Sequence, residues 1–391
     1  MASLSTPSFW RLPLLLCMGC LLWLLGYYLQ PGVDYAANPL FDGNQYLNIY
    51  HWAQGNSPNP EISFPFHSRV LVPLLAALVP VAEPALAFGL INLLFTLLAL
   101  WLMERLWQKL EVPGLYRWLA HAWFLLHWSG AIKLHAFDPI TVDLPIYFFQ
   151  GLLVYIIWQR KWLHLLWLAP LATLQKESFI ALLILLMGLL VFYHWRGMLR
   201  DRGWLWVALA LLLAIGSKWL ANALLPPAEA GPSSIRTILF HAKMTLQNPF
   251  DIVRWFTAII TAGGGFLALA GKSWRRLRER SLLIDALLLL TLCYWAFGIL
   301  AGRDMLRIIF LGFPFQFTLY LLLIKDQPPR LIIMAALFSL PFFRLRGLLP
   351  EPSTETAAWQ SWYPSMAEST LVWVWLAYGI IIGLALWWQR P

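Results

Sequence analysis

The sequence is poor in charged residues and in cysteine. Of its 391 residues only 12% are Asp, Glu, Lys or Arg, whereas a soluble domain carries about 25%. Because 60% of the residues are hydrophobic, no soluble domain of useful size can be drawn from this composition. The three cysteines, Cys17, Cys20 and Cys293, all lie inside apolar runs, so the sequence predicts neither a disulfide framework nor a cysteine metal site.

Several catalytic and binding motifs are also missing. There is no glycine-rich phosphate loop, and Gly263–Gly265 falls inside an apolar run, where small residues allow helices to pack closely. Ser68, Ser129 and Ser178 lack the G-x-S-x-G context of a serine nucleophile. The two halves of the chain show no convincing repeat, which disfavours a transporter built from inverted repeats.

Apolar runs of about twenty residues, each long enough to cross a bilayer as a helix, recur along the chain. We predict an all-α polytopic membrane bundle that forms one domain over residues 1–391. Predicted spans lie near 12–29, 84–103, 115–132, 140–158, 204–225, 255–271, 282–300, 305–324, 330–343 and 370–388.

One apolar segment is too long for a single span. Trp162–Tyr193 has 32 residues, which would measure roughly 48 Å as one helix. Basic residues flank it on both sides, so we predict a re-entrant pair of short helices broken near Pro170 to Lys176. Counting this pair gives about twelve membrane helices.

The basic residues predict the orientation. Most of them cluster between apolar runs, and placing every cluster in the cytoplasm gives one alternation with both termini inside. Orientation therefore accounts for the formal net charge of +9 without a nucleic-acid partner. Compact loops and the lack of organelle signals favour a bacterial inner membrane. The outer side then holds loops 30–83, 133–139, 226–254, 301–304 and 344–369.

The first outer loop contains a polar, aromatic segment, FDGNQYLNIYHWAQG, at residues 41–55. Tyr46, Tyr50 and Ala53 recur at i, i+4 and i+7, with polar side chains on the opposite face, as in an amphipathic helix lying along the membrane. Asp42 stands at its start, and Gln45 follows with the spacing of a capping box.

Asp42 has two interpretations. It can simply cap the helix, since aspartate is favoured at such a place. It can also serve as a general base at the water–lipid interface, because a carboxylate can accept the proton of an acceptor hydroxyl. Asp34, nearer the end of the first span, is the competing candidate.

The next segment, Pro65 to Pro80, is apolar but short, which favours a short helix dipping from the outer side. Arg69 near its start can bind a phosphate through a charge-assisted fork or anchor the chain among lipid headgroups. We group the neighbouring His67 with it as a substrate-binding candidate.

Four charged residues fall at or within predicted membrane segments. Asp138, followed by proline, has the pattern of a helix N-cap, whereas Asp143 lies a turn inside the predicted span and needs a wet cavity or a cation. Both can bind sugar or acceptor hydroxyls. Lys176 and Glu177 at the break either pair with each other or, in the case of Lys176, contact a lipid-linked phosphate.

Two further basic groups lie on the predicted outer side. Arg303 and Arg307 are four residues apart on one helix face, so they form either a phosphate clamp or an interfacial anchor. In loop 226–254, His241 and Lys243 belong to the most basic outer segment, which predicts an anionic partner: lipid headgroups or the phosphate of a lipid donor.

Four stretches together resemble the GT-C superfamily of membrane glycosyltransferases. They are a D-x-x-x-Y pattern (Asp42, Tyr46), a P-x-x-x-R element followed by proline (Pro65, Arg69, Pro73), TLQKESFIALL (Thr173 to Leu182) and DPITVDLP (Asp138 to Pro145). The resemblance implies transfer of a sugar from a polyprenyl-phosphate donor to a glycan, lipid or protein acceptor on the outer face. It also implies a first-loop aspartate as base.

The sequence departs from the family pattern in two ways: we expect no soluble C-terminal domain, and Asp34 and Asp42 are eight residues apart rather than a compact acidic pair. The identity of the base and the need for Mg²⁺ or Mn²⁺ are therefore left open, and no other cofactor is expected. The rival interpretations are a lipid or polyol transporter or flippase, and a non-catalytic membrane subunit of a polysaccharide assembly complex.

Overall fold

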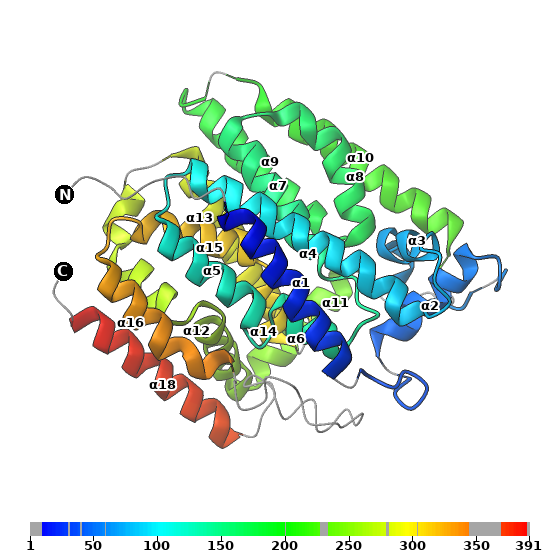
Figure 1. Ribbon diagram of the computed structural model, residues 1–391. Helices are drawn as coiled ribbons and strands as arrows, with labels where there is room; N and C mark the ends of the chain where they lie inside the picture. The colour runs from blue at the N-terminus through cyan, green and yellow to red at the C-terminus, as the bar shows by residue number, and fades with distance from the viewer. Residues whose placement is uncertain are drawn as a thin grey trace.

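The computed structural model describes residues 10–29, 32–39, 41–58, 60–199, 201–226, 234–278, 281–302, 304–343 and 369–388. Within these ranges every regular element is a helix (Figure 1). The α-helices are α1 (Arg11–Leu29), α2 (Asp42–Ala53), α3 (Leu71–Ala77), α4 (Pro84–Lys109), α5 (Gly114–Leu126), α6 (Ala131–Phe137), α7 (Pro145–Gln159), α8 (Leu165–Gln175), α9 (Phe179–Trp195), α10 (Gly203–Leu224), α11 (Ser234–Gln247), α12 (Pro249–Lys272), α13 (Leu282–Leu300), α14 (Met305–Phe310), α15 (Phe313–Ile324), α16 (Pro329–Ser339) and α18 (Ser369–Trp388).

The apolar helices of the bundle are consistent with a membrane protein. Five described helices, α1, α4, α10, α12 and α13, are long and apolar enough to cross a bilayer, and several shorter apolar helices accompany them. The beginning of α1 and the end of α18 lie at the same end of the bundle, while α2 and α3 lie toward the other end (Figure 1). The count of about twelve membrane helices stays a prediction.

Three predicted spans are not continuous helices. The region 115–132 is divided between α5 and α6, and 305–324 between α14 and α15. Pro314 stands in the first turn of α15, a position that favours the start of a new helix. Gly312 before it packs closely on Tyr294, since a β-carbon there would lie 2.7 Å from Cβ of Tyr294. The region 140–158 becomes helical only at Pro145. The prediction that Asp138 caps that helix was therefore wrong.

The long apolar segment is broken as expected, but slightly later. Pro170 lies inside α8, and the helix ends at Gln175, where Lys176 turns to extended backbone (φ −158°, ψ 121°). The next helix, α9, begins at Phe179. Whether this pair re-enters from one side of the bilayer stays a prediction.

The amphipathic helix in the first outer loop is α2. Tyr46 and Tyr50 are buried, in a cluster with residues of α3 and α4, whereas Ala53 is exposed. The predicted capping box is absent, because Asp42 is already inside the helix and Gln45 Oε1 instead accepts a hydrogen bond from the Ser63 amide (2.7 Å). The tyrosine stripe therefore fixes α2 to the protein.

Helix α12 is kinked at Gly264, which has φ +51° and ψ −145°. Backbone groups at the kink find side-chain partners: Trp123 Nε1 donates to the Ala262 carbonyl (2.9 Å), and the Gly265 amide donates to Ser339 Oγ (2.7 Å). Two helices, α5 and α16, thus hold the kink through polar contacts in an apolar interior. Such partners are required, since an unpaired backbone group there is costly.

Gly264→Ala is expected to destabilise the protein by about 1–3 kcal/mol. An alanine there must adopt a positive φ, and its β-carbon would clash with the Trp123 ring and lie 2.8 Å from Ser339 Oγ. Thermal unfolding of the protein in lipid discs measures the effect. Gly271→Ala in the same helix is the matched control, because its β-carbon would meet nothing within 4 Å. Equal stability of the two variants would contradict the prediction.

Candidate active site

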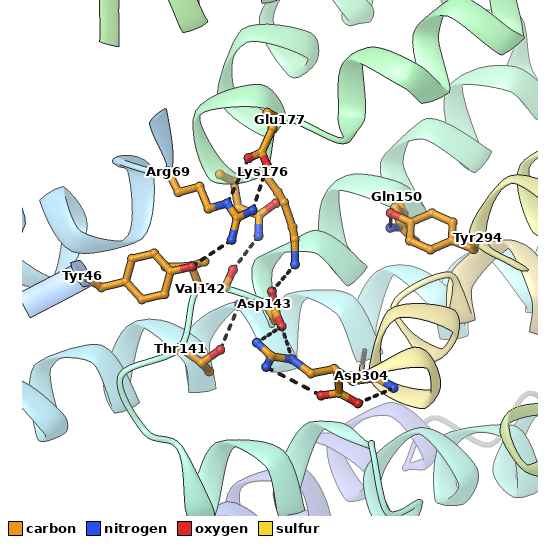
Figure 2. A network of polar contacts seen from close by, with 12 residues as sticks. Tyr46, Arg69, Thr141, Val142, Asp143, Gln150, Lys176, Glu177, Tyr294 and Asp304 are labelled. Carbon is orange, nitrogen blue, oxygen red and sulfur yellow. Dashed lines mark hydrogen bonds and ion pairs between the residues drawn. The ribbon is translucent and has the colours of Figure 1, made fainter. Parts of the chain in front are cut away.

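Asp143 is the centre of a buried ionic cluster (Figure 2). It stands in the non-helical segment 138–144, just before α7, and its side chain is 1% exposed. Lys176 Nζ donates to its Oδ1 at 2.6 Å, and Arg307 Nε donates to its Oδ2 at 2.7 Å. One carboxylate is therefore held between two cations that come from the α8–α9 break and from α14.

The electrostatics of this centre favour an ionised carboxylate. Burial by itself would raise the pKa of Asp143, but the charges of Arg307 and Lys176, with their hydrogen bonds, outweigh it and hold the pKa well below its ordinary value. Both cations keep some exposure, 16% for each side chain. Against Asp143 alone, Lys176 and Arg307 leave one positive charge unmatched, and Arg307 Nη1 also lies 3.9 Å from Asp304 Oδ2.

A second ion pair lies beside the first. Arg69 forms a two-pronged contact with Glu177, from Nε to Oε2 (2.9 Å) and from Nη2 to Oε1 (2.7 Å), and its Nη1 donates to the Tyr46 hydroxyl (3.2 Å). Burial would raise the pKa of Glu177, but the charge of Arg69 lowers it to about 2. Lys176 and Glu177 thus do not pair with each other.

The Lys176–Glu177 dipeptide therefore joins two parts of the molecule. Lys176 points to the segment before α7, while Glu177 points to Arg69 and the first outer loop (Figure 2). This also changes the role predicted for Arg69, because its fork is occupied by Glu177. It positions the α8–α9 break, and the phosphate-binding candidates that keep donors to spare are Lys176 and Arg307.

Asp138 is buried at the other end of the same non-helical segment. Its Oδ1 accepts a hydrogen bond from the Tyr35 hydroxyl (2.6 Å), which in turn accepts one from the Ile140 amide (3.0 Å). Asn92 of α4 donates to the Thr141 carbonyl (3.0 Å). These contacts fix residues 138–144 without helix formation. Burial raises the pKa of Asp138 to about 6, although Arg307 opposes the shift.

Two more carboxylates lie within electrostatic reach of the centre. Asp304 caps α14 by accepting from the Arg307 amide (3.3 Å), and burial raises its pKa to about 6 against the charge of Arg307. Asp42 stands in the first turn of α2, one turn before Tyr46, whose hydroxyl accepts a hydrogen bond from Arg69. The fold therefore brings the first outer loop to the Asp143 centre, which is 101 positions away along the chain.

No hydrogen bond or ion pair to Asp143 is found for the other predicted site residues that the structure describes. Asp34 accepts from the amides of Ala36 (3.0 Å) and Ala37 (3.2 Å) and so stabilises its own turn. His67 is buried against α10, where desolvation and then the charge of Lys218 lower its pKa. His241 lines a separate pocket, and Lys243 is exposed on α11. Arg303 lies outside the described residues.

Sequence reasoning missed the role of Tyr35. Nothing in its local pattern indicates that it bonds to Asp138, 103 positions away. Tyr46 belonged to the D-x-x-x-Y pattern, and the structure gives it a contact with Arg69. Gln150, which donates to the Tyr294 hydroxyl (2.6 Å), was also missed, because a lone glutamine in an apolar helix has many uses.

Within the described part of the chain, no group of three or more His, Cys, Asp or Glu side chains is arranged to hold a metal ion. Two carboxylates of the site already have protein partners: both oxygens of Asp143 face cations, and Asp138 binds Tyr35. The residues present therefore do not fit the optional Mg²⁺ or Mn²⁺, and no chemical step is assigned to one.

Asp138→Asn is expected to become more stable relative to wild type as the pH rises from about 4 to 7. The folded-state pKa of Asp138, about 6, lies above its unfolded value of 3.8. The stabilisation by its protonated form is therefore complete below pH 4 and lost as the pH rises through 6, on the order of 2–3 kcal/mol. Asparagine keeps an acceptor for Tyr35 and does not titrate.

The measurement is the difference in unfolding free energy between Asp138→Asn and wild type at each pH. Buried histidines change the pH dependence in the opposite direction, because acid favours their protonation in the unfolded state. Their contribution is the same in variant and wild type, so the difference between the two cancels it. Asp326→Asn, at a side chain that is 63% exposed, provides the baseline. A difference that stays flat with pH would contradict the raised pKa.

No protein-family model, curated protein or solved structure matches this chain. The function is therefore argued from the geometry and the charges of the site.

Proposed function

We propose that this chain is a membrane glycosyltransferase that transfers a sugar from a polyprenyl-phosphate donor to an acceptor hydroxyl on the outer face. The observation that carries the proposal is the placement of Asp42 in the first turn of α2, whose Tyr46 contacts Arg69, beside the centre where Lys176 and Arg307 both bind Asp143. A carboxylate base beside a cationic phosphate site is what displacement of a sugar phosphate requires.

Lys176 and Arg307 are suited to hold the phosphate. An ammonium has three N–H donors and a guanidinium has five, so each can bind Asp143 and still serve a phosphate oxygen. Asp143 keeps them in place and prevents two buried cations from repelling each other. The charge that develops on the leaving phosphate would then be met by groups that are already oriented, which is how preorganised sites lower a barrier.

Asp42 is the proposed base. The acceptor oxygen forms a bond to the anomeric carbon while the bond from that carbon to the phosphate oxygen breaks. The phosphate leaves with the electron pair, and Asp42 takes the proton of the acceptor hydroxyl. Asp34 is less suited, because one of its oxygens already accepts two amide hydrogen bonds in its own turn.

The orientation of α7 supports chemistry on the outer face. Asp143 stands just before this 15-residue helix, and the basic pair Arg160 and Lys161 follows it, roughly 22 Å away. Because basic clusters favour the cytoplasmic side, the Asp143 end belongs outside. In this orientation the charges would lie in the outer half of the bilayer rather than at the midplane, where transporters place their sites.

The test is sugar release from a panel of radiolabelled polyprenyl-phosphate hexoses and pentoses by the purified protein in lipid discs, with and without a chelator. Turnover of one donor supports the proposal. Its absence across the whole panel, together with movement of the lipid across a vesicle bilayer, would replace the proposal with a flippase. Absence of both activities would favour a non-catalytic subunit.

A further inference from the structure

A second site lies next to the Asp143 centre. A pocket of about 180 Å³ is lined by residues of α11 and the first turns of α12, together with Gly302 and Met305. Asp304, next to Met305 in the chain, caps α14 by accepting from the Arg307 amide. Asp304 therefore links this pocket to the centre proposed to hold the donor phosphate.

The charges in the pocket are balanced, which argues against an anionic ligand. Arg254 Nη1 donates to Asp251 Oδ1 (3.0 Å), and Asn248 donates to the other carboxylate oxygen (3.1 Å). A phosphate entering here would meet the Asp251 carboxylate as well as the guanidinium. The anionic partner predicted for His241 and Lys243 is therefore not favoured here, and Lys243 does not line the pocket.

The pocket nevertheless offers a hydrogen-bond donor. The side chain of Arg254 lines the pocket and is 29% exposed, and its guanidinium has N–H donors beyond the Nη1 donor that serves Asp251. An acceptor oxygen of a ligand can pair with these remaining donors. Phe240 and Met244 add an aromatic and an apolar side chain to the lining. A few fixed polar groups together with an aromatic side chain suit a neutral, hydroxyl-rich ring.

Helix α11 also presents uncovered apolar side chains. Leu239 is 63% exposed, Phe240 58% and Leu246 68%. These residues stand on the helix that lines the pocket, so a ligand whose ring enters the pocket could lay an alkyl chain along α11, within the lipid. The apolar side chains of α11 alone would bind any hydrocarbon chain. The pocket would add selectivity for ligands that carry hydroxyl groups.

We infer that this pocket binds the neutral, polyhydroxylated headgroup of an amphiphile, as the acceptor subsite of the proposed transferase. The assignment of this pocket as an acceptor subsite rests on the proposed function, whereas binding of the headgroup does not depend on turnover. The pocket would present an acceptor hydroxyl past Asp304 to Asp42 and the donor.

The test is binding of octyl glucoside, octyl galactoside and octyl mannoside below their micellar concentrations to the full-length protein in lipid discs. Thermal stabilisation of the protein reports the affinity, and octyl phosphate and octanol are the comparison probes. At least one octyl glycoside is expected to bind roughly tenfold more tightly than both comparison probes. Arg254→Lys and Phe240→Ala are each expected to remove that preference.

Gln247→Ala, at an exposed position of α11 that does not line the pocket, is the matched control and should keep it. Equal binding of glycosides, octyl phosphate and octanol, or a preference unchanged in both pocket variants, would overturn the inference. Arg254→Lys retains the charge beside Asp251 and is expected to fold. If Phe240→Ala fails to fold, Arg254→Lys alone still tests the inference. The readout here is binding, not turnover. Absence of turnover in the wild-type protein would therefore refute the proposed function without affecting this test.

Discussion

Sugar transfer by Asp42→Asn is expected to fall by about 10²–10⁴-fold, the usual contribution of a general base. Asparagine retains the size of aspartate and can still accept a hydrogen bond, but it cannot take the proton of the acceptor hydroxyl. Asp42 is partly exposed in the first turn of α2, a helix held by the buried Tyr46 and Tyr50, so the substitution leaves that anchoring unchanged. The measurement is the initial rate of transfer with saturating donor.

Asp34→Asn is the matched comparison, because it makes the same chemical change in the same loop. It removes the charge of a residue whose oxygen bonds to the Ala36 and Ala37 amides, so its expected effect is on the local turn and less than tenfold on the rate. Donor affinity is measured in parallel and should be unchanged in Asp42→Asn. If Asp34→Asn lost activity and Asp42→Asn kept it, the assignment of the base would be reversed.

The fold class followed from the sequence because its signal is local and repeated. Apolar runs of membrane length do not depend on distant residues, and α1, α4, α10 and α13 lie close to the predicted bounds. The departures occur where tertiary contacts decide. The segment before α7 stays non-helical because its backbone and Asp138 bond to Asn92 of α4 and to Tyr35. No local rule predicts those partners.

The charged residues of the candidate site were found for a similar reason: a charge in or near an apolar run is rare and therefore conspicuous. Asp143, Lys176 and Arg307 were each identified from the sequence, but their pairing was not. The nearest of these pairs is 33 positions apart, and the local alternative, a Lys176–Glu177 pair, was equally compatible with the sequence. Sequence alone gives the candidates, and packing decides which of them meet.

Removing the central carboxylate by Asp143→Ala is expected to destabilise the protein by about 3–5 kcal/mol. The side chain is 1% exposed, and its loss leaves Lys176 and Arg307 close together in a buried place without a counter-charge. Asp251→Ala breaks a pair whose side chains are 22–29% exposed, so it should cost less than about 1 kcal/mol. Thermal unfolding of both variants in lipid discs gives the comparison.

A triple variant separates the structural role of this cluster from its function. Asp143→Leu, Lys176→Met and Arg307→Met together replace all three charges with apolar side chains of similar length. Because desolvation offsets most of the attraction in a buried ionic cluster, such replacements are often neutral or stabilising by about 1–4 kcal/mol. We therefore expect the unfolding temperature of the triple variant to be no lower than that of Asp143→Ala and close to that of wild type.

The same triple variant is expected to lose binding of the polyprenyl-phosphate donor, because the two cations proposed to hold the phosphate are gone. Recovered stability without donor binding would mean that the buried charges are retained for function at no gain in stability. Recovered stability with donor binding intact would place the phosphate elsewhere and reduce Lys176 and Arg307 to structural residues. The two outcomes differ in a single binding measurement on a folded protein, so a loss of function cannot be confused with unfolding.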